Sequence, residues 1–178
     1  GRTSCAMAAV TDIGFADAVA KKLAAGLGMP IIIKPANLGS SIGITVVKTP
    51  SGFENAVELA FRYDDKVIVE KALTDFREIN CACYKAGGKY MVSPCEEPIT
   101  KNDVLTFDDK YVTPAEKQFP ARLPESVAGR IRELTAYIYR KLEFDGIIRI
   151  DYLLDGETVY VNEINSVPGS LAYYLFVK

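Results

Sequence analysis

The segments GIIRIDYLL and ETVYVNEIN, residues 146–154 and 157–165, constrain the fold of this 178-residue chain more than any other feature. Both are rich in the branched and aromatic residues that favour strands, and the turn-forming pair Asp155-Gly156 lies between them. Two such runs around a short turn predict a β-hairpin. We therefore expect a fold in which antiparallel strands are prominent.

The rest of the chain predicts further strands and helices in a mixed order. Short apolar or alternating runs predict strands over residues 30–34, 44–48, 66–71, 77–86 and 89–93. Apolar spacing predicts helices over residues 15–27, 53–63 and 124–142, and Ser51 with Glu54 forms a capping-box pattern before the second of them. Residues 97–120 lack periodicity and indicate a functional loop. The expected fold class is α+β with mainly antiparallel strands.

Composition excludes several classes of function. The formal net charge is −2 and no basic block occurs, which argues against nucleic acid as a partner. No apolar run approaches the roughly 18 residues of a membrane span, so we expect a soluble, cytoplasmic protein without a membrane partner. The four cysteines have no zinc-type spacing and the chain has no histidine, so the cysteines are expected to be reduced core residues. Catalysis would rest on carboxylates, Lys, Arg, backbone amides or a metal ion.

The second strand of the hairpin carries Asn162, Glu163 and Asn165, which is unusual for a strand that buries one face. Because strands have a period of two, Glu163 and Asn165 point to the same face. Carboxylate and amide oxygens suit a hard cation such as Mg²⁺. The pattern therefore suggests a metal site that needs a third oxygen nearby.

Asp151 supplies that oxygen only in one hairpin register. A two-residue Asp155-Gly156 turn would place Asp151 with Asn162. A three-residue turn over Asp155–Glu157, or an equivalent bulge, would place on one face the residues Arg149, Asp151, Val161, Glu163 and Asn165, with Arg149 opposite Glu163. An ion pair between Arg149 and Glu163 beside a surface Asp151 is an equally open alternative.

A second candidate is the loop KPANLGSSIG, residues 34–43. Gly39 and Gly43 let the backbone approach an anion, and serine hydroxyls and amides can donate to phosphate oxygens beside Lys34. The loop lacks the Gly-Lys-Ser/Thr ending of a Walker A motif, and a flexible hairpin loop is the alternative. The strand VIVEKAL ends in Glu70 and Lys71, which could equally be residues emerging into solvent.

In combination, these features resemble the ATP-grasp superfamily and, within it, the carboxyl-terminal part of the D-alanine–D-alanine ligase family. The resemblance covers residues 28–169 and rests, in order, on IIIKPANLGSSIGI, YDDKVIVEKAL, REI, GIIRIDYLL and VYVNEINSVPG. It implies an ATP-grasp fold in which two antiparallel sheets hold ATP. It also implies a reaction in peptidoglycan precursor synthesis in which a carboxylate is phosphorylated and an amine attacks the acyl phosphate.

The family motifs imply roles for individual residues. Lys34 would contact ATP phosphate, and the covering loop would consist of Ser40, Ser41 and Ile42. The adenine and ribose would contact Glu70, Lys71, Leu73 and Glu78, with Leu153 as a further nucleotide contact. Magnesium, or manganese, would be bound by Asp151, Glu163 and Asn165. The implied catalytic residues are Arg149, the Gly169 amide, Ser41, and Lys110 and Tyr111 of a closing loop.

The resemblance also divides the chain and limits its expected activity. Residues 1–14 resemble the end of a preceding domain, residues 15–96 a phosphate-loop and adenine-binding subdomain, and residues 97–178 the closing loop and metal-binding part. The expected partners are ATP and amino acids, D-alanine foremost, and the full-length protein could form a homodimer. Because the family's amino-terminal domain is almost wholly absent, we expect the chain alone to bind Mg²⁺-ATP weakly and to make little dipeptide.

The segment SLAYYLF after Gly169 departs from the residues that bind the second substrate in the family, so the amino acids joined are not specified. A ligase for other amino acids, a non-catalytic nucleotide-binding module and a purely structural α+β domain remain alternatives.

Overall fold

The computed structural model describes residues 22–23, 25–38, 41–99 and 116–177. These residues fall into two compact units, one ending at Thr74 and the other beginning at Asp75. The strands of residues 77–86 and 89–92 lie in the second unit, whereas the division suggested from the sequence falls between residues 96 and 97. No helix within the described ranges is long and apolar enough to cross a membrane.

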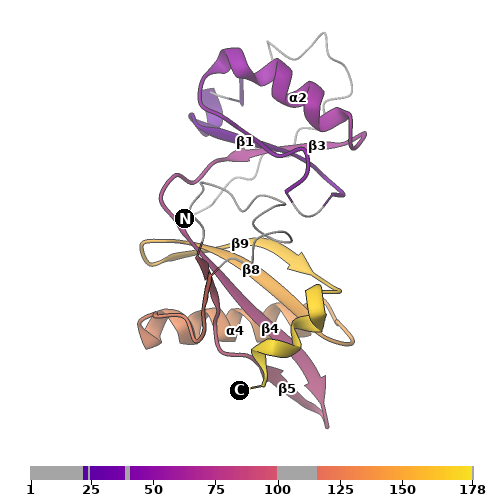
Figure 1. Cartoon of the computed structure of the whole chain (residues 1–178), viewed down its shortest axis with the longest axis vertical. Coiled ribbons are helices and arrows are strands. Elements are labelled where there is room, and N and C mark those ends of the chain that lie inside the picture. Colours follow the sequence, from indigo (N-terminus) through magenta and orange to yellow (C-terminus); the bar gives the residue numbers. More distant parts are fainter. Residues whose placement is uncertain (1–21, 24, 39–40, 100–115, 178) are drawn as a thin grey trace. The chain divides into compact units, whose positions relative to one another are not determined.

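The first unit contains a three-stranded antiparallel sheet with a helix on one face (Figure 1). The sheet has the order β2-β1-β3 and consists of β1 (Ile31–Pro35), β2 (Thr45–Val47) and β3 (Val67–Lys71). Alternate residues of β1 and β3 form a core with helix α2 (Phe53–Phe61). Lys34 and Glu70 alternate with these core residues and therefore lie on the other face of the sheet.

The helical predictions for this unit are confirmed only in part. The described residues between 22 and 27 are helical, and the remainder of the predicted helix 15–27 lies outside the described residues. The capping box predicted at Ser51 and Glu54 is wrong. A short 3₁₀ turn, η2 (Pro50–Gly52), precedes α2, and Gly52 occupies the N-cap without a side-chain hydrogen bond. The Ser51 hydroxyl lies 3.1 Å from Oγ1 of Thr49 instead.

The second unit contains a four-stranded antiparallel sheet of order β5-β4-β8-β9 and a separate two-stranded sheet. The four strands are β4 (Arg77–Ala86), β5 (Lys89–Val92), β8 (Ile148–Asp155) and β9 (Thr158–Asn165). The smaller sheet pairs β6 (Glu97–Ile99) with β7 (Glu116–Gln118), so the prediction that residues 97–120 lack regular structure is wrong at both ends of that range. Helix α4 (Glu125–Lys141) covers one face of the large sheet (Figure 1).

The core of the second unit lies between α4 and that sheet. Val127 and Ile131 of α4 pack with Ile150, Tyr152 and their neighbours. The hydroxyls of Thr135 and Tyr152 lie 2.7 Å apart, which satisfies both groups inside the core. Leu142, predicted to continue the apolar stripe, is instead the exposed C-cap residue.

Three of the four cysteines are confirmed as reduced and buried, namely Cys81, Cys83 and Cys95; Cys5 lies outside the described residues. Burial raises the pKa of the Cys83 thiol to about 12. The thiol therefore stays protonated at neutral pH, and its role is packing rather than chemistry.

Candidate functional site

The β8–β9 hairpin turns at Gly156-Glu157, so neither turn considered from the sequence forms. Gly156 has a φ of +56°, which suits glycine at this position. The register runs from Asp155↔Thr158 to Tyr152↔Val161 and then shifts at a β-bulge. Asn162 is the extra residue of this bulge, because the next pair is Asp151 with Glu163.

The bulge confirms the expectation that a register shift brings the polar residues together. Asp151 lies opposite Glu163, and Arg149 lies opposite Asn165, so all four share one face of the sheet. Two details of the prediction are wrong: Arg149 is not opposite Glu163, and Val161 pairs with Tyr152. Without this shift, the register set by the two-residue turn would place Asp151 opposite Asn162.

Arg149 and Asp151 form a bidentate ion pair. Nε and Nη2 of Arg149 donate to the two carboxylate oxygens of Asp151 at 2.6 Å and 2.8 Å. Nδ2 of Asn165 donates to Oδ2 of Asp151 at 3.1 Å. Asp151 is only 3% exposed, so the alternative of an Arg149–Glu163 pair beside a surface Asp151 is wrong.

The ion pair also sets the charge state of Arg149. Burial opposes the charged form, but the hydrogen bonds and charge of Asp151, together with Tyr174, raise the pKa of Arg149 above its ordinary value. The guanidinium is thus a permanent positive charge on this face. It can donate to an anionic group that approaches the sheet.

Asn80 is a member of this site that the sequence did not single out. On β4 it lies directly beside Asp151, so Asn80, Asp151 and Glu163 form one row across three strands. Asn80 is 5% exposed and its Oδ1 has no hydrogen-bond partner among the residues that the structure describes. The alternation of REINCACYKA could have placed it on the polar face, because Ile79 and Cys81 on either side belong to the core.

The oxygen atoms on this face fit a hard cation. Asn165 uses its Nδ2 for Asp151, which leaves Oδ1 as an available acceptor beside two carboxylates. Within the described ranges no group of three or more His, Cys, Asp or Glu residues is arranged to hold a metal. A site here would therefore use two carboxylates and an amide, the set that Mg²⁺ accepts when water and phosphate complete its shell.

In the first unit, Lys34 and Glu70 form an ion pair on the sheet face away from α2. Nζ of Lys34 lies 2.7 Å from Oε2 of Glu70, across the antiparallel pair β1–β3. Ile32 lies opposite Glu70, and Ile68 lies opposite Lys34, and both are only partly buried. This face therefore combines two charges with apolar side chains, a mixture that is common in small-molecule sites.

The predicted phosphate loop is held at its start by Asp64, a second residue that the sequence analysis missed. The Asn37 amide donates to Oδ2 of Asp64 at 2.6 Å, and the Asn37 side chain contacts both carboxylate oxygens. The hydrogen bond from the Asn37 backbone is the main cause that lowers the pKa of Asp64. The bond spans 27 residues, so no local pattern indicates it.

The end of the same loop needs glycine at position 43. Gly43 has a φ of +73°, and a Cβ there would lie 2.8 Å from Cδ2 of Tyr63 and 2.9 Å from Cγ of Pro35. Ser41 also has a positive φ, of 59°. The loop is thus built from backbone conformations that few residues accept.

We expect Gly43→Ala to destabilise the β1–β3 sheet by about 1–3 kcal/mol, because alanine would be strained at this φ and would clash with two neighbours. Hydrogen exchange of the β1 and β3 amides measures the loss. Gly52→Ala is the matched control, since its added Cβ would come no closer than 3.5 Å to Val47. Equal losses in the two variants would show that the loop geometry is unimportant.

The other predicted residues are placed as follows. Leu73 is partly buried and Lys71 is exposed at the end of β3. Glu78 and Leu153 are register partners, on the same face as Asp151. Gly169 opens the segment η3 (Gly169–Leu175), in which Ser170, Leu171 and Ala172 have φ near +50°. Ser40, Lys110 and Tyr111 lie outside the described residues.

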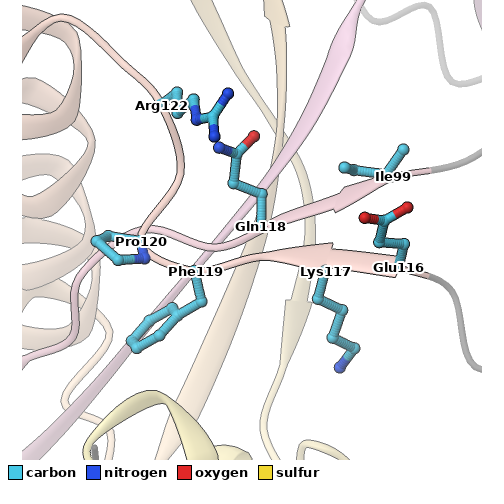
Figure 2. Close-up of a pocket in the computed structure, with 7 residues that line it drawn as sticks. All are labelled: Ile99, Glu116, Lys117, Gln118, Phe119, Pro120 and Arg122. Atoms are coloured by element: carbon cyan, nitrogen blue, oxygen red, sulfur yellow. The ribbon is translucent and has the colours of Figure 1, made fainter.

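An open groove runs beside β7 in the second unit (Figure 2). It is lined by Ile99, Glu116, Lys117, Gln118, Phe119, Pro120 and Arg122. None of these residues belongs to the predicted site. In Figure 2 the side chains of Lys117 and Gln118 leave the strand in opposite directions.

Comparisons with known proteins agree on one family. The family model for the D-Ala-D-Ala ligase C-terminus matches residues 6–178. The D-alanine–D-alanine ligase of Thermosipho melanesiensis is 42% identical over 164 residues, which are 89% of this chain. The D-alanine–D-alanine ligase structure from Helicobacter pylori matches 97% of the chain with a TM-score of 0.75 and 33% identity. The VanG D-Ala:D-Ser ligase from Enterococcus faecalis matches 96% with a TM-score of 0.77 and 29% identity.

These matches cover only part of each relative. The chain spans 44% of the Thermosipho melanesiensis protein, 52% of the Helicobacter pylori chain and 50% of the Enterococcus faecalis chain. The fold is that of these ligases, the ATP-grasp fold, with antiparallel sheets and packed helices. The chain therefore belongs to the D-alanine–D-alanine ligase family and corresponds to its carboxyl-terminal part.

Proposed function

We propose that this chain is the ATP- and magnesium-binding part of a ligase that joins amino acids through an acyl phosphate. The observation that carries the proposal is the polar face of β8 and β9. Arg149, Asp151, Glu163 and Asn165 converge there although Asp151 is almost fully buried. The buried charge of Asp151 is compensated by Arg149, but Oδ1 of the buried Asn80 beside it has no partner among the described residues, and such departures from a satisfied core are expected at functional sites.

The second unit would bind the metal ion and the reacting phosphate. Asp151, Glu163 and Asn165 would hold Mg²⁺, or Mn²⁺, which would bridge phosphate oxygens and offset their charge. Arg149 and the Gly169 amide would donate to the oxyanion of the tetrahedral intermediate. These groups need no histidine, in agreement with a chain that has none.

The first unit would bind the nucleotide. Lys34 would donate to ATP phosphate, and the residues Ser40, Ser41 and Ile42 would cover it with their amides. Glu70, Lys71 and Leu73 would contact the adenine. In this arrangement the Lys34–Glu70 ion pair separates when ATP binds, because Lys34 then donates to phosphate and Glu70 contacts the adenine. Glu78 and Leu153 of the second unit would contact the ribose and the base, and Lys110 and Tyr111 would close over the phosphate.

The relatives' names suggest D-alanine as the amino acid, and D-serine as a second candidate. Both are tested because the segment SLAYYLF departs from the residues that bind the second substrate in the family. The proposed enzyme would phosphorylate the carboxylate of one amino acid and release phosphate when the amine of the second attacks. Any dimer would be a property of the longer protein.

The test is a phosphate-release screen with D-alanine, D-serine and L-alanine. The chain is assayed alone and fused behind the amino-terminal part of the Thermosipho melanesiensis relative, with Mg²⁺-ATP binding as the check that each form is folded. We expect both forms to bind Mg²⁺-ATP and the fusion to release phosphate with a D-amino acid. Nucleotide binding by both forms, with no release for any amino acid, would instead support a non-catalytic nucleotide-binding module.

A further inference from the structure

Glu96 is a buried carboxylate that the proposed reaction does not use. It is 1% exposed and lies between β5 and β6. Three donors meet its oxygens: Nδ2 of Asn80 at 3.2 Å, the hydroxyl of Tyr174 at 3.1 Å and Nζ of Lys117 at 3.4 Å. A buried charge with this many partners is held in one position.

The backbone also ties Glu96 to the candidate site. The Asn80 amide donates to the Glu96 carbonyl at 2.8 Å, and the Glu96 amide donates back at 2.9 Å. Asn80 is the cross-strand neighbour of Asp151. Glu96 is therefore fixed one strand away from the ion pair of Arg149 and Asp151.

Tyr174 interacts with the Glu96–Lys117 ion pair and also with Arg149 of the Arg149–Asp151 ion pair. Its side chain packs against the cluster of Ala82, Ala172 and Leu175, and Ala82 is the cross-strand neighbour of Arg149. Its hydroxyl donates to Glu96, and Nζ of Lys117 lies 4.3 Å from the centre of its ring. Burial, and then the charge of Glu96, raises the pKa of Tyr174, so the hydroxyl keeps its proton for that bond. Tyr174 also contributes to the raised pKa of Arg149.

We propose that Tyr174 and Glu96 are positioning residues that hold the Arg149 guanidinium in the orientation in which it pairs with Asp151. Glu96 fixes the Tyr174 hydroxyl, and the Tyr174 side chain packs in the cluster that contains Ala82, the strand neighbour of Arg149. The remaining guanidinium donors are then directed to the open side of the sheet. The catalytic part of this inference rests on the proposed function, in which Arg149 stabilises an oxyanion, whereas the positioning of Arg149 can be measured without it.

The first measurement uses the Nε–Hε NMR signal of Arg149 in the 178-residue chain, assigned by its loss in Arg149→Lys. We expect Tyr174→Phe and Glu96→Gln to shift this signal and to speed its exchange with water about tenfold, because one constraint on the guanidinium is lost. The matched controls are Tyr173→Phe and Glu116→Gln, which change exposed residues next to the same elements. An Arg149 signal that is unchanged in Tyr174→Phe would overturn the inference.

The second measurement uses the fusion protein described above. We expect Tyr174→Phe to lower kcat about tenfold while the KM for ATP stays the same, since only the oxyanion donor is misplaced. A shifted Arg149 signal with unchanged kcat in an active fusion would refute the catalytic role. If the unmodified fusion has no ligase activity, the proposed function fails, and the Arg149 signal still decides whether Tyr174 and Glu96 position it.

Discussion

Arg149→Met is expected to lower the stability of the second unit by about 3–5 kcal/mol, the typical cost of leaving one partner of a buried ion pair without compensation. Asp151 is 3% exposed, and among the described residues its side chain would retain only the hydrogen bond from Asn165. Because the chain has two units, the measurement is hydrogen exchange of the β4 and β8 amides, which reports on this sheet alone. Arg140→Met, an exposed change at the end of α4, is the control.

The double variant Arg149→Met with Asp151→Leu should recover most of that loss, because replacing a buried ion pair by apolar residues is often neutral. It should also lose Mg²⁺-dependent ATP binding, which would separate the functional role of the pair from its effect on stability. Millimolar Mg²⁺ should restore part of the stability of the Arg149→Met variant by supplying the missing positive charge. A loss below about 1 kcal/mol for Arg149→Met would contradict the buried, paired state of Asp151.

Glu163→Gln is expected to weaken Mg²⁺-ATP binding by about tenfold or more, and to leave metal-free ATP binding unchanged. The change removes one of two carboxylates from the metal face and leaves the nucleotide contacts of the first unit intact. Calorimetry with and without Mg²⁺ gives both affinities, and Mn²⁺ binding followed by water relaxation gives the affinity for the metal ion directly.

Glu157→Gln is the matched control, because Glu157 lies in the exposed turn of the same hairpin. Glu70→Gln should instead weaken ATP binding by the same factor with and without metal, because Glu70 is proposed to contact the adenine and not the metal ion. If Glu163→Gln reduced both affinities by the same factor, Glu163 would have a structural role and the assignment of the metal ligands would be wrong.

The sequence predicted the strands and the polar face well because both depend on local alternation. The bounds of β4 are confirmed at Arg77 and Ala86, and the shared face of Asp151 and Glu163 follows once a bulge is allowed. The position of the bulge could not be predicted. A period-two pattern does not distinguish an extra residue in the turn from one in the strand, and here the extra residue is Asn162.

Two contacts that the sequence analysis missed join residues that lie far apart along the chain. Asp64 contacts Asn37 across 27 residues, and Tyr174 contacts Glu96 across 78. Contacts between residues this far apart do not produce any pattern in the local spacing of the sequence. The failed capping box has a local cause, since Pro50 favours a 3₁₀ turn that places Gly52, and not Ser51, at the N-cap of α2.

The most direct test of the central claim is calorimetric titration of the 178-residue chain with ATP, first with Mg²⁺ and then with EDTA. The account predicts binding that is measurable with Mg²⁺ and much weaker without it, because Asp151, Glu163 and Asn165 act on the phosphates through the metal. Absence of ATP binding at millimolar concentration, or equal binding in the two conditions, would contradict the claim that the polar face of β8 and β9 is a metal–nucleotide site.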